Sequence, residues 1–509
     1  MGIVCQFQEP ILYHLTLVYN KQIMKRYFKY IALICLSVSA LSCKKGFLEE
    51  SSQDLVRPTT TVALNQLMTG EAYPLNSVIT EFSDLLTDDI QSEYNANATV
   101  VSALNKYAPA FTWQKNMIDR LLENSATNSN IWYNYYARIK GCNVVLDYVD
   151  QVDGTESEKQ NLRGQALALR SFYYLMLVNY FGKPYYGANG NPEIDLGVPL
   201  ILTADVTDNP VGRSTVKAVY AQIENDLLAA IPLLDAAGAG NHIYKFNGTS
   251  ARFLLSRVYL YMGNWDASIR YADATLQKKS TLKQMNEITT ATFGISSAVS
   301  SPEVIWGYGF NAELSVMPFG GGQSVSKAAY FISDDLGNTF PTTDLRAKYS
   351  FTSVAYITTT LNTYKGRSAK FVAGNTNGKA FRTAEVYLNR AEAYIQKAIA
   401  GDGSALNKAL TDINLLRSNR ITSAAYTPIS ITNAQDLYAF YKAERRRELC
   451  LEDSRWFDLR RWGMPELKHT IQLSAGTPQV ETLQQNDNRY TLAIPTEALT
   501  RNPNLIQNP

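Results

Sequence analysis

The chain has 509 residues, of which 46% are hydrophobic and 18% are charged, so it has ample material for a large core. Lysine and arginine together number 48 against 46 acidic residues, and the net charge of +2 argues against a dedicated nucleic-acid binder, which needs a strong basic excess. Three histidines leave little for metal or acid–base chemistry, whereas 32 tyrosines suit wet interfaces and polar ligands.

The N-terminal region has the layout of an export signal. A basic start at 24–29 precedes an apolar run over 31–41, which is too short to remain as a membrane-spanning helix. Cys43 follows small residues in a pattern that resembles the lipobox of bacterial lipoproteins. We therefore expect 1–42 to be a signal peptide, with 1–23 an over-long start, and Cys43 to be lipidated. An ordinary signal peptide cleaved nearby is the alternative.

A short polar tether over 43–58 separates this anchor from the rest of the chain. Beyond it only Cys142 and Cys450 remain, which make one pair at most, and the sequence leaves open whether they are bonded. An exported chain of this length with so few cysteines depends on its core rather than on disulfides.

From the tether to about residue 280 the apolar spacing is mostly helical. Long helical segments are predicted over 131–149, 158–182, 215–234 and 250–277. In the first of these, Tyr135, Ile139 and Cys142 lie on one stripe. The second ends at Gly182 with Pro184 soon after, which are the expected stop signals.

Two parts of the chain have the pattern of a helix pair. In 250–277, large and small residues alternate around Gly263 in a way that resembles a tetratricopeptide helix pair, with Gly263 at the turn. Segments 383–398 and 404–420 predict another pair. Because one pair cannot bury its apolar faces alone, about three or more pairs must stack.

The composition of the sequence changes over 281–380, where Ser, Thr and Gly dominate. "EVIWGYGF" (303–310) is typical of a strand, with Trp306 expected in the core, and 317–331 is typical of a loop. Functional residues favour loops on a rigid scaffold. The end of the chain, 489–509, is predicted to form a strand and turns rather than a helix.

The most densely charged segment is "ERRRELCLEDSRWFDLRRWG" (444–463), with six arginines against five carboxylates. Apolar residues over 438–459 fall on one helical stripe that charges interrupt, and buried charges must be paired. Two local ion pairs are predicted at i, i+3: Arg445–Glu448 and Glu452–Arg455. Arginines are also expected to stack on Trp456 and Trp462. Because the charges nearly cancel, we interpret the segment as scaffold rather than as a phosphate-binding patch.

This segment resembles the C-terminal signature of the SusD/RagB family of outer-membrane nutrient-binding lipoproteins. Other matching segments follow in the family's order: "ALALRSFYYLMLVNYFGKPYY" (166–186), "GVPL" (197–200), "RSTVKAVYAQIENDL" (213–227), "RTAEVYLNRAEAY" (382–394) and "NPNLIQNP" (502–509). Together they cover nearly all of the mature chain. None of them is catalytic, so they specify the fold well and the ligand poorly.

The resemblance implies a mainly α fold, with about four tetratricopeptide-like helix pairs packed against an irregular, loop-rich ligand-binding region with a few short strands. A SusD-like domain would span 59–509. Its expected parts are an N-terminal helical part at about 59–280, a loop-rich insertion at about 281–380, a C-terminal helical part at about 381–470 and an irregular tail at 471–509.

The resemblance also implies a function. Family members are anchored by lipid on the outer face of the outer membrane and act as a lid on a TonB-dependent, SusC-like transporter, to which they pass captured oligosaccharides. No catalysis and no cofactor are implied. Two other functions stay open: a peptide receptor on the same scaffold and anchor, and a protein–protein adaptor built on the helical repeats.

The resemblance places the ligand site outside the repeats, in 84–100, 107–116 and 317–331. A sugar-binding surface needs flat aromatic faces and a polar rim. The candidate residues are Tyr94, Trp113, Phe319 and Tyr330 for the faces, and Asp89 and Asn95 for the rim. The glycines at 320–322 lack the context of a phosphate-binding loop, and no metal-ligand motif such as HExxH or CxxC is visible. Adjacent acids in polar loops, such as Asp88/Asp89 and Asp334/Asp335, are usually solvated, which argues against a glycosidase.

Overall fold

The computed structural model describes residues 57–74, 82–187, 190–205, 209–237, 242–288, 294–309, 329–353, 366–368, 370 and 378–509. Pro58–Pro509 form one compact unit, and Met1–Arg57 belong to a separate one. The predicted signal peptide, Cys43 and nearly all of the predicted tether lie outside the described residues, as does Phe319. Within the described ranges, no helix is both long enough and apolar enough to cross a bilayer.

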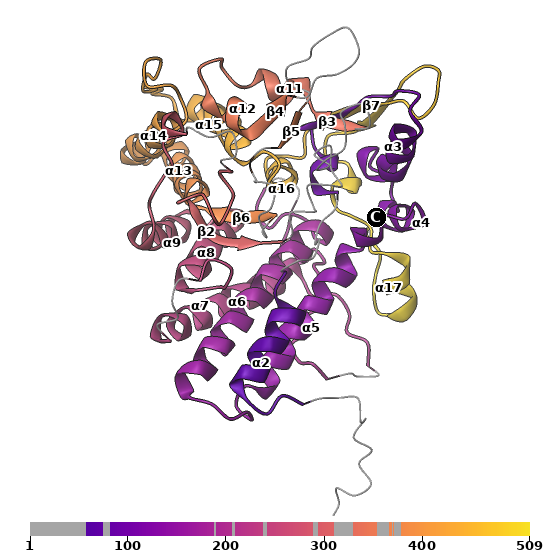
Figure 1. Cartoon of the computed structure of the whole chain (residues 1–509), viewed down its shortest axis with the longest axis vertical. Coiled ribbons are helices and arrows are strands. Elements are labelled where there is room, and N and C mark those ends of the chain that lie inside the picture. Colours follow the sequence, from indigo (N-terminus) through magenta and orange to yellow (C-terminus); the bar gives the residue numbers. More distant parts are fainter. Residues whose placement is uncertain are drawn as a thin grey trace, which may run out of the picture. The chain divides into compact units, whose positions relative to one another are not determined.

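The first half of the described chain is built mainly from helices (Figure 1). Their bounds are α2 Thr61–Leu67, α3 Ala98–Phe111, α4 Met117–Glu123, α5 Ile131–Tyr148, α6 Glu156–Phe181, α7 Val216–Ala236, α8 Gly248–Met262 and α9 Trp265–Lys278. The start of α6 is fixed by a capping box, in which the side chains of Thr155 and Glu158 each accept a hydrogen bond from the other's backbone N–H. The three predicted helices before residue 240 nearly coincide with α5, α6 and α7.

Gly263 ends α8 and lets the chain turn into α9, as the helix-pair pattern predicted. Its φ of +72° lies in the left-handed region, which glycine adopts at little cost. The second predicted pair is formed by α13 (Thr383–Ile399) and α14 (Gly403–Ser418). Because α9 and α8 both pack against α13, the two pairs form one stack although the insertion separates them in sequence. The mainly α architecture with stacked helix pairs is therefore confirmed.

Short antiparallel strands connect the helical parts. Their bounds are β1 Ile90–Ser92, β2 Val304–Tyr308, β3 Tyr330–Ile332, β4 Phe351–Ser353, β5 Gly366–Ser368, β6 Lys379–Arg382, β7 Leu467–Ile471 and β8 Gln479–Leu483. They pair as β1–β3, β2–β6, β4–β5 and β7–β8. The strand predicted at 303–310 is β2, and Trp306 is fully buried in it, as expected. Two short helices, α11 (Asp334–Asn338) and α12 (Leu345–Ser350), also lie in this region.

Two predictions for the C-terminal part are wrong. The single helical stripe over 438–459 is broken, because α15 (Ala434–Leu449) ends and α16 (Arg455–Arg461) begins after a turn. In that turn Leu451 and Asp453 have φ of +63° and +58°, which a right-handed helix does not allow. The tail also differs, since α17 (Thr496–Arg501) is a short helix and no strand lies within 489–509, all of which the structure describes.

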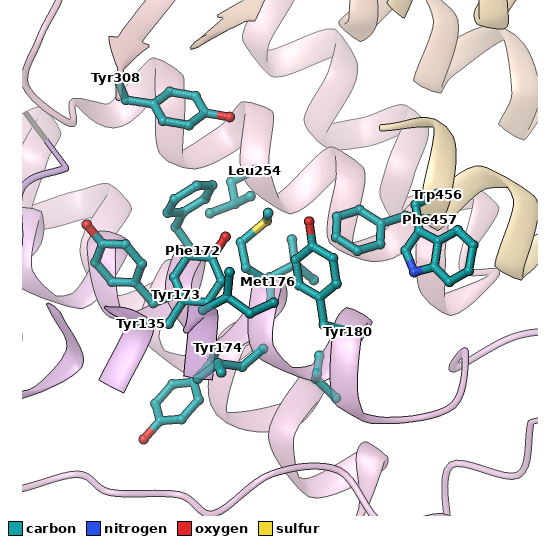
Figure 2. Packing of buried hydrophobic residues seen from close by; sticks show 14 of the residues in the cluster. Tyr135, Phe172, Tyr173, Tyr174, Met176, Tyr180, Leu254, Tyr308, Trp456 and Phe457 are labelled. Atoms are coloured by element: carbon teal, nitrogen blue, oxygen red, sulfur yellow. The ribbon is translucent and has the colours of Figure 1, made fainter. Parts of the chain in front are cut away.

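The centre of the hydrophobic core is α6, in which every side chain from Ala168 to Phe181 is buried. A helix that is buried on all sides must have neighbours on all sides. Figure 2 shows Phe172 close to Tyr308 of β2 and Tyr180 close to Phe457 of α16, with ring centroids 5.3 and 4.9 Å apart. The core thus joins the N-terminal helices to the insertion and to the charged C-terminal segment.

Candidate functional site

The charged C-terminal segment is a buried scaffold, as predicted, and is not an open cleft. At its centre Glu448 is 2% exposed and accepts hydrogen bonds from Arg382 at 2.8 Å and from Arg420 at 3.0 Å. Glu303, which directly precedes β2, accepts from the same two guanidiniums at 3.0 and 2.7 Å. Burial acts to raise the pKa of Glu448, and the neighbouring guanidiniums outweigh burial and hold it well below its ordinary value.

The partners in this network come from different elements, which corrects the predicted pairs at i, i+3. Arg445 pairs with Asp458 at 2.8 Å rather than with Glu448. Glu452 pairs with Arg382 and with Lys370, each at 2.7 Å, rather than with Arg455. The network therefore connects β6, α15 and the insertion, instead of stabilising one helix.

A second set of buried ion pairs surrounds Glu392 of α13. Its carboxylate accepts a 2.7 Å hydrogen bond from Arg461 and a 3.1 Å hydrogen bond from the Trp462 indole. Burial alone would raise the pKa of Glu392, but the Arg461 guanidinium lowers it to about 2. The predicted stacking of arginine on tryptophan holds for Trp462, whose ring lies 4.8 Å from Arg461. Trp456 instead stacks on Tyr490, with ring centroids 4.9 Å apart.

Asp89, predicted to lie on the rim of the ligand site, is fully buried and pairs with Arg446 at 2.7 Å. The neighbouring Asp88 pairs with Arg455 at 2.7 Å. The sequence context suggested that both acids are solvated loop carboxylates, and this prediction is wrong. Their ion pairs instead join the segment before β1 to α15 and α16. Burial raises the pKa of Asp89.

Trp113 and Tyr330, predicted aromatic faces of the site, are also buried, at 2% and 3% exposure. The Trp113 indole N–H donates to the Leu86 carbonyl at 2.9 Å, and its ring stacks on His469 at 4.2 Å. The Tyr330 hydroxyl donates to the Leu104 carbonyl at 2.8 Å. Both side chains therefore pack in the interior of the protein and have almost no accessible surface.

Tyr94 and Asn95 follow β1 and are half-buried, so they are the described candidates with accessible surface. The Tyr94 ring packs against the main core, and the Asn95 side-chain oxygen accepts from the Asn97 backbone at 2.9 Å. The β1–β3 pairing sets Ser92 opposite Tyr330, which brings the residues around Asp89, Tyr94 and Tyr330 to one region. Phe319 lies outside the described residues. A role in ligand binding stays a prediction for all six candidates.

The structure also contains an open groove that the sequence did not predict. It lies between the start of α5 and α17 and has a volume of about 400 Å³. Aromatic side chains of Trp132, Tyr133 and Tyr136 line one side, and α17 supplies Glu497 and Arg501 on the other. The aromatic spacing on α5 was visible in the sequence. The opposite wall was not, because it comes from the far end of the chain.

Cys142 and Cys450 are both buried and are free thiols, so they are not bonded to each other. Burial raises the pKa of the Cys450 thiol to about 12, which keeps it protonated and unreactive. Among the described residues, no group of three or more His, Cys, Asp or Glu side chains is placed to hold a metal ion.

Comparisons with known proteins identify the family. A family model described as "Starch-binding associating with outer membrane" matches residues 46–260, and the SusD family model matches residues 328–509. The chain belongs to the SusD/RagB family. A curated relative, SusD-like protein P25 of Formosa agariphila, is 21% identical, over 94% of this chain and 97% of that protein.

Solved structures of the same superfamily share the fold. A SusD superfamily protein from Bacteroides thetaiotaomicron has a TM-score of 0.70 and 22% identity, covering 89% of this chain and all of that one. A SusD-like carbohydrate-binding protein from Bacteroides vulgatus has a TM-score of 0.63 and 21% identity, covering 88% of this chain and 97% of that one. At such identities these structures establish the fold alone.

Proposed function

We propose that this protein is a cell-surface lipoprotein that binds extracellular oligosaccharides and delivers them to a TonB-dependent, SusC-like transporter of the outer membrane. It acts as a binding protein and carries out no reaction. The observation that supports this most strongly is family membership, since the two matching models together span most of the chain and one is described as starch-binding and associated with the outer membrane.

The interior of the structure is consistent with a binding protein. In the densest cluster of charged groups, Glu303, Arg382, Arg420 and Glu448 are at most 2% exposed and are paired with one another. Groups that are enclosed and saturated in this way stabilise a fold and cannot reach a substrate. The most chemically dense segment therefore supplies rigidity, and ligand binding falls to other parts of the surface.

In this proposal the oligosaccharide lies against the residues that follow β1. The Tyr94 ring offers a face to a sugar ring and the Asn95 amide a hydrogen bond to a hydroxyl, with Phe319 as a further candidate. The remaining candidates, Asp89, Trp113 and Tyr330, are buried and support the binding surface from within the protein. Aromatic contacts of this kind contribute on the order of 0.5–1.5 kcal/mol each, which suits capture followed by release.

The proposal is tested by applying the purified protein to a glycan array and, in parallel, to a peptide array of comparable size. We expect saturable binding to a set of neutral oligosaccharides, weakened by Tyr94→Ala. Tyr186→Ala, at an exposed tyrosine outside this site, is the control and should bind like wild type. Binding to peptides alone would identify a peptide receptor instead, and binding to neither would favour a protein–protein adaptor.

A further inference from the structure

The groove between α5 and α17 joins segments from opposite ends of the described chain. One wall is the first turns of α5, and the other is α17 with the residues after it. Between them lie Pro199 and Ile201, from the segment that follows α6. The Tyr136 hydroxyl donates to the Pro199 carbonyl at 2.7 Å, and Thr496 at the start of α17 bonds to Asp119 of α4 at 2.6 Å. The groove is therefore held by hydrogen bonds on two sides. Its volume of about 400 Å³ lies within the range of about 300–1,000 Å³ typical of small-molecule sites.

The α5 wall is an aromatic surface. Trp132 and Tyr136 are one turn apart, with ring centroids 5.1 Å apart, and the Trp132 ring is held from behind by Phe181 at 4.9 Å. Tyr133 is 68% exposed, which is a large exposure for a ring of this size. Asn130 caps α5 by accepting from the Tyr133 backbone N–H at 3.1 Å, which fixes this turn. A rigid surface of rings with one exposed member is suited to contact the apolar face of a flat ligand.

The opposite wall supplies polar groups whose charges cancel. Glu497 and Arg501 lie one turn apart on α17 and form a 2.9 Å ion pair, with side chains 60% and 78% exposed. Asn502 follows and, like Asn130, adds an amide to the lining. Because the pair is neutral as a unit, it offers little attraction to a charged peptide terminus or to an anion. Carboxylate, guanidinium and amide groups still provide acceptors and donors for hydroxyl groups.

We infer that this groove is a second carbohydrate-binding site, which takes one or two sugar rings of an uncharged oligosaccharide. The sugar's apolar face lies on the exposed Tyr133 ring, and its hydroxyls bond to Glu497, Arg501 and Asn502. Trp132 is only 8% exposed and supports this surface from within the protein. The inference rests on the proposed function, since it names an additional surface by which the same class of ligand is captured. It is separate from the predicted site after β1, because none of the five candidates for that site that the structure describes lines the groove.

Calorimetry with defined probes tests the inference. Maltoheptaose, cellohexaose, laminarihexaose and xylohexaose are titrated into the full protein. The same titrations are made into Tyr133→Ala, Glu497→Gln, Tyr94→Ala and the control Tyr186→Ala. Tyr133 and Glu497 are both largely exposed, so their variants should fold, and thermal melts confirm it. We expect at least one probe to bind at a site that Tyr133→Ala weakens by about two- to tenfold and Tyr94→Ala leaves unchanged.

The possible results separate the two proposals. If a probe binds wild type and both groove variants with the same affinity and stoichiometry, the groove is not a sugar site and the proposed function stands. If no probe and no other neutral glycan binds wild type, the proposed function fails and the groove inference falls with it. If Tyr133→Ala abolishes co-purification of an outer-membrane protein but leaves glycan binding intact, the groove is a protein interface and the inference is overturned.

Discussion

Replacing Glu448 by glutamine removes the charge at the centre of the buried ion-pair cluster and keeps the shape of the side chain. The carboxylate lies 2.8 Å from Arg382, 3.0 Å from Arg420 and 3.3 Å from Arg346. After the change these guanidiniums remain buried with less opposing charge. Glutamine also directs an amide N–H, a donor, toward groups that can only donate.

The size of the loss follows from the burial. Removing one partner of a buried ion pair costs about 3–5 kcal/mol, because the remaining charge stays out of water without compensation. Glu303 and Glu452 still pair with Arg382 in the variant, so we expect the lower part of this range, about 3 kcal/mol. That is a large fraction of the roughly 5–15 kcal/mol that stabilises a typical protein.

Guanidinium chloride unfolding of wild type, Glu448→Gln and Glu123→Gln measures the free energies of unfolding. Glu123 pairs with Arg120 at the surface, where the side chains are 62% and 54% exposed, so its variant should lose less than about 1 kcal/mol. Urea unfolding with added salt is a further check. The loss of unfolding free energy in Glu448→Gln should persist at high salt, because salt screens buried pairs weakly. A Glu448→Gln protein as stable as Glu123→Gln would refute the view that this cluster braces the fold.

Three further predictions concern other parts of the chain. Burial raises the pKa of Asp84 to about 7. Because the folded pKa exceeds the unfolded value, stability should fall as pH rises from about 4 to about 7 and then level off, and Asp84→Asn should remove this fall in unfolding curves measured across that range. Gly263→Ala should destabilise by about 1–2 kcal/mol or more, since its φ is +72° and a Cβ would lie 2.6 Å from the Tyr186 ring. Gly403→Ala, at the start of α14 with open space and no positive φ, should lose little by thermal or denaturant unfolding, and equal losses would contradict the argument from strain and crowding. Cys43→Ala should abolish labelling by a radioactive lipid precursor in cells, and a variant that still labels would rule out the anchor.

Much of the fold was predictable because its signals are local. The helices α5, α6 and α7 follow from apolar spacing and stop signals, and the α8–α9 turn follows from Gly263 among large and small residues. The break between α15 and α16 was missed because the apolar stripe continues across it. The helix ends at Cys450, whose ψ of 142° is extended, and Leu451 and Asp453 then adopt left-handed φ. Leucine gives no sign of such a conformation, and a single aspartate, although enriched there, does not outweigh a continuous apolar stripe.

The partners within the ion-pair network were not predictable. Spacing in a helix suggests neighbours at i, i+3, but Glu448 binds Arg382, which lies on a strand far away in sequence. Because Glu448 is buried, its carboxylate must be fully paired, and its partners come within reach only when the elements have packed together. The interpretation of the segment as scaffold held because it depended only on the balance of charge and on the cost of burying it.

The candidate site was less predictable than the fold for the same reason. Whether an aromatic ring is exposed to solvent or buried in the interior depends on which residues pack against it. Trp113 is covered by His469 of β7, which stacks on it from the other end of the chain. The groove between α5 and α17 likewise exists only because the C-terminal residues return to the first helices.

The most direct test of the account is calorimetric titration of purified wild-type protein with the oligosaccharide that binds most strongly on the glycan array, followed by chromatography of the recovered sugar. We expect a saturable heat of binding and an oligosaccharide recovered at its original length. Shortened products would show an enzyme, and the absence of any heat with neutral oligosaccharides would contradict the conclusion that this member of the SusD/RagB family captures glycans.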